Sequence, residues 1–276
     1  MDLMLYLPSI IAALLSGATA GLTGVMVNGL RMPFITVSSA HAAMAGAVFG
    51  LVLQERTGIA LPSDLTAFIG ALLGASMLAF ILRKRRQDPN AALGAIFSLM
   101  LGLSFLGIGM LEGPKSAALS LLWGDPVFIT RAQIITIAII FFLLLAFLTL
   151  FNKELKVLLF SRELAHALIP ETLIFLLLLL LTSAVITINL QTVGGLLLFS
   201  LIANPSIAAL KVARRYRSVL VWSGFFGALS AVGGFFVAFW LDLPAGACIV
   251  LFSSAIVGVV EIFRKSVKHG RSPKST

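Results

Sequence analysis

The stretch "IITIAIIFFLLLAFLTLF", residues 134–151, runs without a single charged residue and decides the fold class. A helix crosses the hydrocarbon core of a bilayer with about 20 apolar residues, so this run is close to one membrane span. The stretches "IIAALLSGATAGLTGVMV" (10–27) and "TLIFLLLLLLTSAVITI" (172–188) have the same character. Only helices and closed barrels cross a bilayer, and continuous apolar runs exclude the alternation of a barrel.

The composition of the whole chain points the same way. It is 59% hydrophobic and 11% charged, whereas soluble domains average roughly 45–50% and 25%. The sequence therefore predicts an all-α, polytopic integral membrane helical bundle. No cleavage site separates a removable signal peptide from the first span. The single cysteine, Cys248, excludes an internal disulfide and a cysteine-based metal cluster.

Apolar runs and the residues that interrupt them predict eight or nine spans, the seventh being short and containing a proline. The predicted spans are 8–30, 34–53, 62–82, 90–111, 131–151, 170–190, 192–209, 218–240 and 245–263. We expect one transmembrane domain over 1–264 and a basic, disordered cytoplasmic tail over 265–276.

The basic residues orient the bundle. If the loop "RKRRQDPN" (83–90) is cytoplasmic, all but three of the 20 Lys and Arg lie on the cytoplasmic side, the exceptions being Arg56, Lys115 and Arg131. The positive-inside rule then predicts an outside amino terminus and a cytoplasmic carboxyl terminus. The net charge of +9 thus reflects membrane topology and contact with lipid, and we expect no nucleic-acid partner.

A long motif, "LQTVGGLLLFSLIANPSIAALKVARRYRS" (190–218), carries the most specific signal. Proline removes a backbone donor and disfavours helix in the preceding residue, so a break or kink is predicted at Asn204-Pro205. The segment of about 205–218 then reads as a short amphipathic helix on the cytoplasmic face. Such a helix either docks into a groove of a partner or anchors to anionic lipid.

A second motif, "WLDLPAGACIVL" (240–251), forms a tight outer turn. Asp242 is either a cation-attracting carboxylate at a pore entrance or an N-cap at a short turn. Gly246 allows the following helix to start close to a neighbour.

His41 lies within "VSSAHAAMAG" (37–46), among very small residues. Ser38, Ala42, Gly46 and Gly50 recur every four residues, which predicts a flat face for close helix packing. An ionisable residue inside a membrane is a candidate functional site, and neutral imidazole is a common metal ligand. The alternative is a histidine that hydrogen-bonds a serine or carbonyl across a helix interface.

These motifs, in this order, resemble the permease subunit of the ABC-3 family of zinc, manganese and iron transporters. The resemblance rests on "RMPFITVSSAHAAMAG" (31–46), "VGGLLLFSLIANPSIAAL" (193–210) and "DLPAGACIVL" (242–251). A weaker match, "SRELAHAL" (161–168), has Glu163 and Ala165 in place but not the acidic residue that the family has at Ser161.

The resemblance implies a second permease subunit (a homodimer or heterodimer), cytoplasmic ATP-binding cassette ATPases and an extracytoplasmic solute-binding protein. It also implies a prokaryotic plasma (inner) membrane and makes the 205–218 segment a coupling helix. The chain itself contains no P-loop, nucleophile elbow or H-E-x-x-H motif, so we expect a non-enzymatic subunit whose ATP hydrolysis occurs in the partner. Two family positions differ, because Val37 replaces an aspartate and Ala40 replaces a serine.

We therefore expect an importer of divalent metal, zinc or manganese, with no intrinsic cofactor. A chelated metal or siderophore-like compound, or an ATPase-independent carrier or channel, are the alternatives. The expected translocation residues are His41, Ser38, Asp242 and Asn204. The expected ATPase-coupling residues are Pro205, Ser206, Ala209, Lys211, Arg214 and Arg215. The expected helix-packing glycines are Gly46, Gly50, Gly194 and Gly246.

Overall fold

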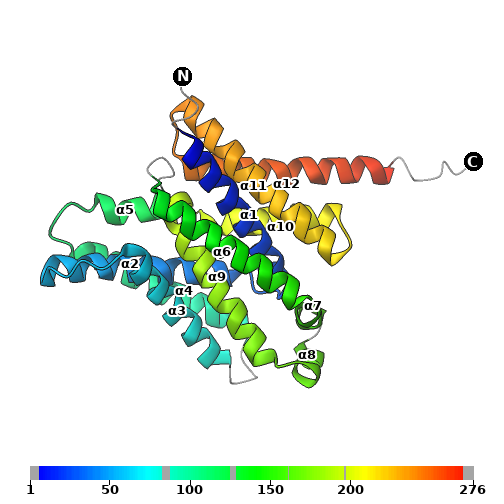
Figure 1. Cartoon of the computed structure of the whole chain (residues 1–276), viewed down its shortest axis with the longest axis horizontal. Helices are drawn as coiled ribbons and strands as arrows, with labels where there is room; N and C mark the ends of the chain where they lie inside the picture. The colour runs from blue at the N-terminus through cyan, green and yellow to red at the C-terminus, as the bar shows by residue number, and fades with distance from the viewer. Residues whose placement is uncertain (1–5, 83–87, 125–128, 161, 196, 270–276) are drawn as a thin grey trace, which may run out of the picture.

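A computed structural model of the chain describes residues 6–82, 88–124, 129–160, 162–195 and 197–269. Over these ranges the secondary structure is helical, and no strand occurs in them. The helices are α1 (Leu7–Gly29), α2 (Phe34–Thr57), α3 (Ser63–Leu82), α4 (Pro89–Met110), α5 (Ser116–Trp123), α6 (Arg131–Leu150), α7 (Asn152–Phe160), α8 (Arg162–Leu168), α9 (Glu171–Val193), α10 (Leu198–Val212), α11 (Tyr216–Leu241) and α12 (Ala245–His269). Figure 1 shows their arrangement.

Eight helices in the described ranges are long and apolar enough to cross a membrane: α1, α2, α3, α4, α6, α9, α11 and α12. The predicted all-helical membrane bundle is confirmed. The bounds of the predicted span 192–209 are wrong. Helix α9 continues to Val193 and ends at Gly194, whose φ is 89°. Helix α10 then has 15 residues, or about 22 Å, which is short of a core of about 30 Å.

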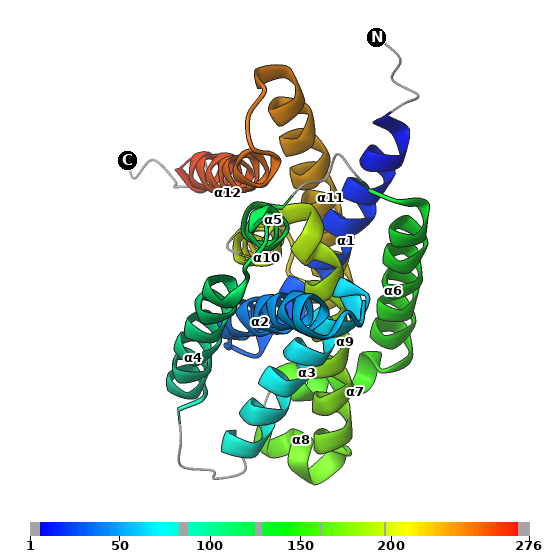
Figure 2. The same cartoon turned by 90° about the vertical axis from the view of Figure 1, so that its left-hand side faces the viewer.

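The long helices run back and forth between two ends of the molecule. In Figure 1 the α6–α7 and α10–α11 connections and the carboxyl end of α12 lie to the right, whereas the amino end of α1 and the α11–α12 turn lie at the upper left. Figure 2 shows α2 and α9 near the middle of the bundle, with α4 and α6 on opposite flanks. The three short helices α5, α7 and α8 connect longer ones at these ends.

Helices α1 and α11 touch backbone to backbone. A Cβ atom at Gly17 would overlap the carbonyl oxygen of Gly227, and one at Gly227 would overlap the carbonyl oxygen of Gly17. The Oγ of Ser223 also donates to the carbonyl oxygen of Gly21 over 2.6 Å. Small residues allow this approach, and close packing drives helix association in a bilayer, where there is no hydrophobic gain between helices.

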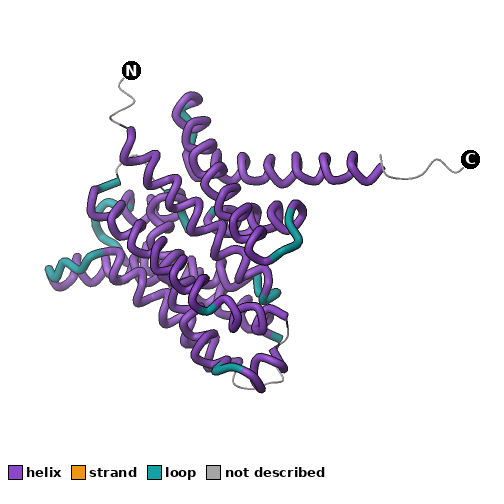
Figure 3. The backbone as a smooth tube through the Cα atoms, turned by 45° about the vertical axis from the view of Figure 1, so that its right-hand side comes forward, coloured by secondary structure: helices purple, strands orange, loops and turns teal. Residues whose placement is uncertain are grey.

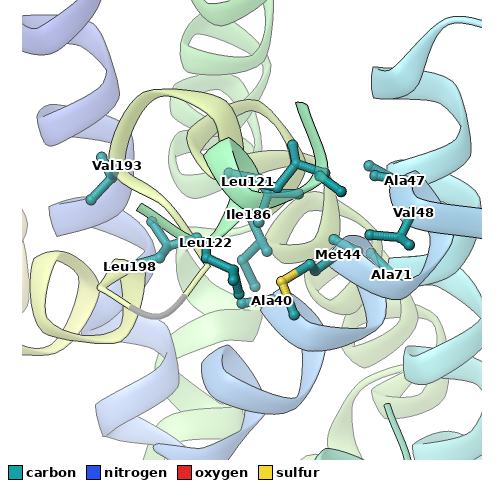
Figure 4. Packing of buried hydrophobic residues seen from close by; sticks show 14 of the residues in the cluster. Ala40, Met44, Ala47, Val48, Ala71, Leu121, Leu122, Ile186, Val193 and Leu198 are labelled. Atoms are coloured by element: carbon teal, nitrogen blue, oxygen red, sulfur yellow. The ribbon is translucent and has the colours of Figure 1, made fainter. Parts of the chain in front are cut away.

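Helix α2 is packed on several sides, by α3, α4, α9 and α5. One part of the core joins Ala40 and Met44 of α2 to Ile186 of α9 and to Leu121 and Leu122 of α5. Figure 4 shows these side chains converging around Met44. The turn after α9 is tied to α5 as well, because the Gly195 N–H donates to the carbonyl oxygen of Leu121 over 2.9 Å.

Of the break or kink predicted at Asn204-Pro205, the break is wrong, because α10 continues through Pro205 to Val212. Proline removes one backbone hydrogen bond, and side chains near it supply others. The Oγ of Ser206 donates to the carbonyl oxygen of Ala203 over 2.8 Å. The amide nitrogen of Asn28, on α1, donates to that Oγ over 2.5 Å. Membrane helices tolerate proline where serines and neighbouring helices supply such bonds.

The predicted basic tail of residues 265–276 begins within α12. Helix α12 extends to His269, and residues 270–276 lie outside the described ranges. Figure 3 shows the last turns of α12 projecting beyond the other helices. The loop 83–87, which carries the basic residues used to orient the bundle, also lies outside those ranges.

Candidate functional site

His41 is buried in α2, with 3% of its surface exposed. It is seven residues after Phe34, the first residue of α2, and therefore about 10 Å along the helix axis from that end. Its Nδ1 lies 3.0 Å from the carbonyl oxygen of Val37. Since a carbonyl can only accept, Nδ1 carries the proton, and Nε2 of the neutral ring has a free lone pair.

Nε2 of His41 is buried and has no hydrogen-bond partner among the residues that the structure describes. Buried polar atoms are normally paired, so an unpaired one in a native structure requires an explanation. An imidazole whose other nitrogen bonds a carbonyl has the usual arrangement of a metal-binding histidine. The chemistry of this atom therefore fits transient coordination of a cation.

Helix α4 covers the imidazole. The ring of Phe97 meets the ring of His41 edge to face, with 4.9 Å between their centres. On either side of this contact, the Oγ of Ser38 donates to the carbonyl oxygen of Leu93 over 2.7 Å. The Oγ of Ser104 donates to the carbonyl oxygen of His41 over 3.3 Å. His41 thus lies in a hydrogen-bonded interface between α2 and α4.

The other expected translocation residues lie in different parts of the fold. Asn204 is on α10, where its amide nitrogen donates to the Oγ atoms of Ser253 (2.9 Å) and Ser254 (3.1 Å) of α12. Asp242 is exposed and has a φ of 52° as the C-cap of α11, so its predicted alternative role as an N-cap is wrong. Only Ser38 shares an interface with His41.

No group of three or more His, Cys, Asp or Glu side chains within the described ranges could hold a metal ion. A structural zinc site needs about four such ligands. A transported ion needs sites that it can also leave. One buried imidazole is therefore compatible with transient binding of a passing cation but not with a stable structural metal site.

The expected coupling residues divide into a buried and an exposed group. Pro205, Ser206 and Ala209 are buried inside the bundle, so they do not lie on an exposed surface of the described chain. The Nζ of Lys211 forms an ion pair with Glu261 of α12 over 2.7 Å. Arg214 and Arg215 are exposed in the short link between α10 and α11.

Two of the expected packing glycines form a close helix crossing. A Cβ at Gly46 would overlap the carbonyl oxygen of Thr66, and one at Gly50 would lie 2.5 Å from the Oγ1 of the same threonine. Both therefore pack against α3. Gly194 ends α9, and Gly246 is buried near the start of α12. Ser38, predicted on the same face as these glycines, bonds α4 instead.

Phe97 and Asn28 were absent from the sequence-based prediction, and Ser104 was predicted there only as one of the small residues of 90–110 that allow close helix packing. Asn28 was detectable as the one amide in the first apolar span. Phe97 and Ser104 lie in a segment rich in glycine and serine, where nothing in the sequence marks the residues that face His41.

Eight long apolar helices within the described ranges define the class of this protein as a multi-pass helical membrane protein. The chain belongs to the ABC 3 transport family, whose model matches residues 2–264. Membership of this family, together with the eight apolar helices, makes it an integral protein of a prokaryotic plasma membrane.

Two curated relatives cover nearly all of the chain. The manganese transport system membrane protein MntC of Halalkalibacterium halodurans is 27% identical over 91% of this chain and 85% of its own length. The high-affinity zinc uptake system membrane protein ZnuB of Haemophilus influenzae is 27% identical over 92% of this chain and 96% of its own length. The solved structure of PsaBC from Streptococcus pneumoniae in complex with Fab shares the fold, with a TM-score of 0.81 at 23% identity, covering 93% of this chain and 90% of that one.

Proposed function

We propose that the chain is the membrane-spanning permease subunit of an ATP-driven importer of divalent metal ions, zinc or manganese. The observation that carries this proposal is the buried Nε2 of His41, whose lone pair is left free by the bond between Nδ1 and Val37. Family membership and the names of relatives such as MntC and ZnuB support it. The metal is the substrate, and no resident cofactor is assigned.

His41 acts as a transient ligand on the translocation path, together with the hydroxyl of Ser38 in the same interface. Asp242 at the exposed α11–α12 turn attracts cations toward the bundle. Asn204 is a further residue of the proposed translocation path. Its hydrogen bonds to Ser253 and Ser254 also hold α10 against α12. These three locations lie in different parts of the fold and do not form one site.

The partners of this function are a second permease subunit, an extracytoplasmic solute-binding protein and a cytoplasmic ATPase. The proposed orientation has the amino terminus outside and the carboxyl terminus in the cytoplasm, because the basic residues of the α10–α11 link and of α12 then face the cytoplasm. At that end Leu210 and Val212 are 54% and 47% exposed beside Arg214 and Arg215.

The ATPase docks on this end of the bundle, and the docking surface includes the short helices α7 and α8. Phe160 and Leu168, which end these helices, are 84% and 68% exposed. Large apolar side chains outside the eight spans suit burial by a protein partner. Helix α8 also contains most of the segment that resembles a cytoplasmic motif of the ABC-3 family.

The test of the function is metal uptake by cells that express the complete transporter. His41→Ala is expected to lower zinc and manganese uptake while expression and copurification of the ATPase stay unchanged. His166→Ala, at a histidine with an exposed side chain, serves as the control for loss of an imidazole. Because His166 lies on α8, copurification of the ATPase is measured for this variant as well. Normal metal uptake in His41→Ala would contradict the proposed role of His41 as a metal ligand.

The test of the docking surface is copurification of the ATPase. A double charge reversal, Arg214→Glu with Arg215→Glu, and separately Leu168→Asp on α8, are expected to reduce the bound ATPase. Membrane insertion should be unaffected, because both sites lie outside the eight spans. Full transport without any bound ATPase would instead indicate a secondary carrier or channel. ATP-dependent uptake of a chelated metal but not of the bare ion would favour the chelate alternative.

A further inference from the structure

Phe97 of α4 is in direct contact with the buried imidazole of His41. His41 has 3% of its surface exposed, yet its Nε2 must meet a cation if it acts as a ligand. The ring of Phe97 packs edge to face on the imidazole, at 4.9 Å between centres and 82° between planes. Phe97 itself is only partly buried, so this ring lies between the buried imidazole and the outer side of α4.

The backbone of α4 is fixed near this contact. Four residues before Phe97, the carbonyl oxygen of Leu93 accepts a hydrogen bond from Ser38. Seven residues after it, the single hydroxyl proton of Ser104 is shared between the carbonyl oxygen of Met100 (2.7 Å) and that of His41 (3.3 Å). Moving α4 away from α2 would break buried hydrogen bonds, whereas rotating one phenyl ring would break none.

Near Gly94 and Gly102, the outer side of α4 is not packed against another described helix. A Cβ atom at Gly94 or at Gly102 would meet no other atom within 4 Å. Ser98 is exposed between them, and its Oγ bonds the carbonyl oxygen of Gly94 on its own helix. By contrast, Gly107 on the same helix faces Val48 of α2, which a Cβ there would approach to 2.7 Å.

We propose that Phe97 controls access to Nε2 of His41, its ring covering the imidazole in the closed position and exposing it when it rotates toward the open side of α4. Phe97 is thus an access-determining residue of the translocation path. The importance of this role for transport rests on the proposed function of His41. The access itself is measurable without transport.

The test is chemical modification of the full-length protein in membranes with diethyl pyrocarbonate, which reacts with the free imidazole nitrogen, followed by mass spectrometry of each histidine. In Phe97→Ala the modification rate of His41 is expected to rise by about tenfold, equivalent to about 1.4 kcal/mol in the opening equilibrium. The exposed His166 is the internal reference and should react equally in all variants. Phe105→Ala, at a 53% exposed phenylalanine of the same helix, is the matched control.

Equal modification of His41 in wild type and Phe97→Ala would overturn the proposal, as would an equal rise in Phe105→Ala. If Phe97→Ala does not fold, Phe97→Leu supplies the test, with a smaller rise expected from the partly retained bulk. A rise in modification together with normal metal uptake in His41→Ala would support the access role of Phe97 and overturn only the ligand role of His41.

Discussion

The Nδ1 atom of His41 donates to the backbone carbonyl of Val37 over 3.0 Å. Val37, where the resemblance to the family leads us to expect an aspartate, thus still contacts the histidine, but through its backbone. This bond orients the imidazole and fixes its neutral tautomer, as carbonyl partners commonly do for metal-binding histidines. It cannot supply the negative charge that a carboxylate would bring to a bound cation.

Val37→Asp is therefore expected to change the choice of metal. Residues 37 and 41 are four apart on α2 and share one face. A carboxylate there adds a hard ligand that suits manganese, whereas imidazole alone suits zinc. The ratio of manganese to zinc uptake should rise on the order of tenfold. Val37→Asn introduces a side chain of similar shape to that of Val37→Asp but without the charge. An equal manganese-to-zinc uptake ratio in the two variants would show that the negative charge does not determine the choice of metal.

Two glycines provide a matched test of the packing. Gly17→Ala places a methyl group against the carbonyl oxygen of Gly227, whereas Gly102→Ala meets nothing within 4 Å. Overpacking costs about 1–3 kcal/mol, so Gly17→Ala should lower the melting temperature of the purified protein in detergent. Gly102→Ala should leave it unchanged. If both melt like the wild type, the α1–α11 contact is looser than described.

The sequence predicted the spanning helices because their signal is local. The length of an apolar run and its lack of charged residues are both visible within about 20 consecutive residues. The short helices α5, α7 and α8 were not predicted, since seven to nine residues are too few for a periodic pattern. The position of His41 on a closely packed helix was also a local inference.

The features that the sequence did not predict correctly depend on contacts between residues far apart in the chain. Pro205 predicts a break on its own, but Ser206 and Asn28 bond the neighbouring groups, and these two are separated by 178 positions. The covering of His41 by Phe97 depends equally on how α2 and α4 pack. The role of Arg214 and Arg215 remains a prediction, because an exposed basic link suits both a protein partner and anionic lipid.

The pair Asn28 and Ser206 gives the last prediction, a double-mutant cycle across α1 and α10. The Nδ2 of Asn28 donates to the Oγ of Ser206, which itself donates to the carbonyl oxygen of Ala203. Hydrogen bonds between membrane helices contribute about 0.6 kcal/mol on average and up to about 1.7, so each single alanine variant should lower the melting temperature measurably. Because both side chains act through one network, the double variant should lose less than the sum of the singles. Ser98→Ala, which removes an exposed hydroxyl bonded within its own helix, should melt like the wild type. Strict additivity in the cycle would mean that Asn28 does not support α10 at Pro205 through Ser206.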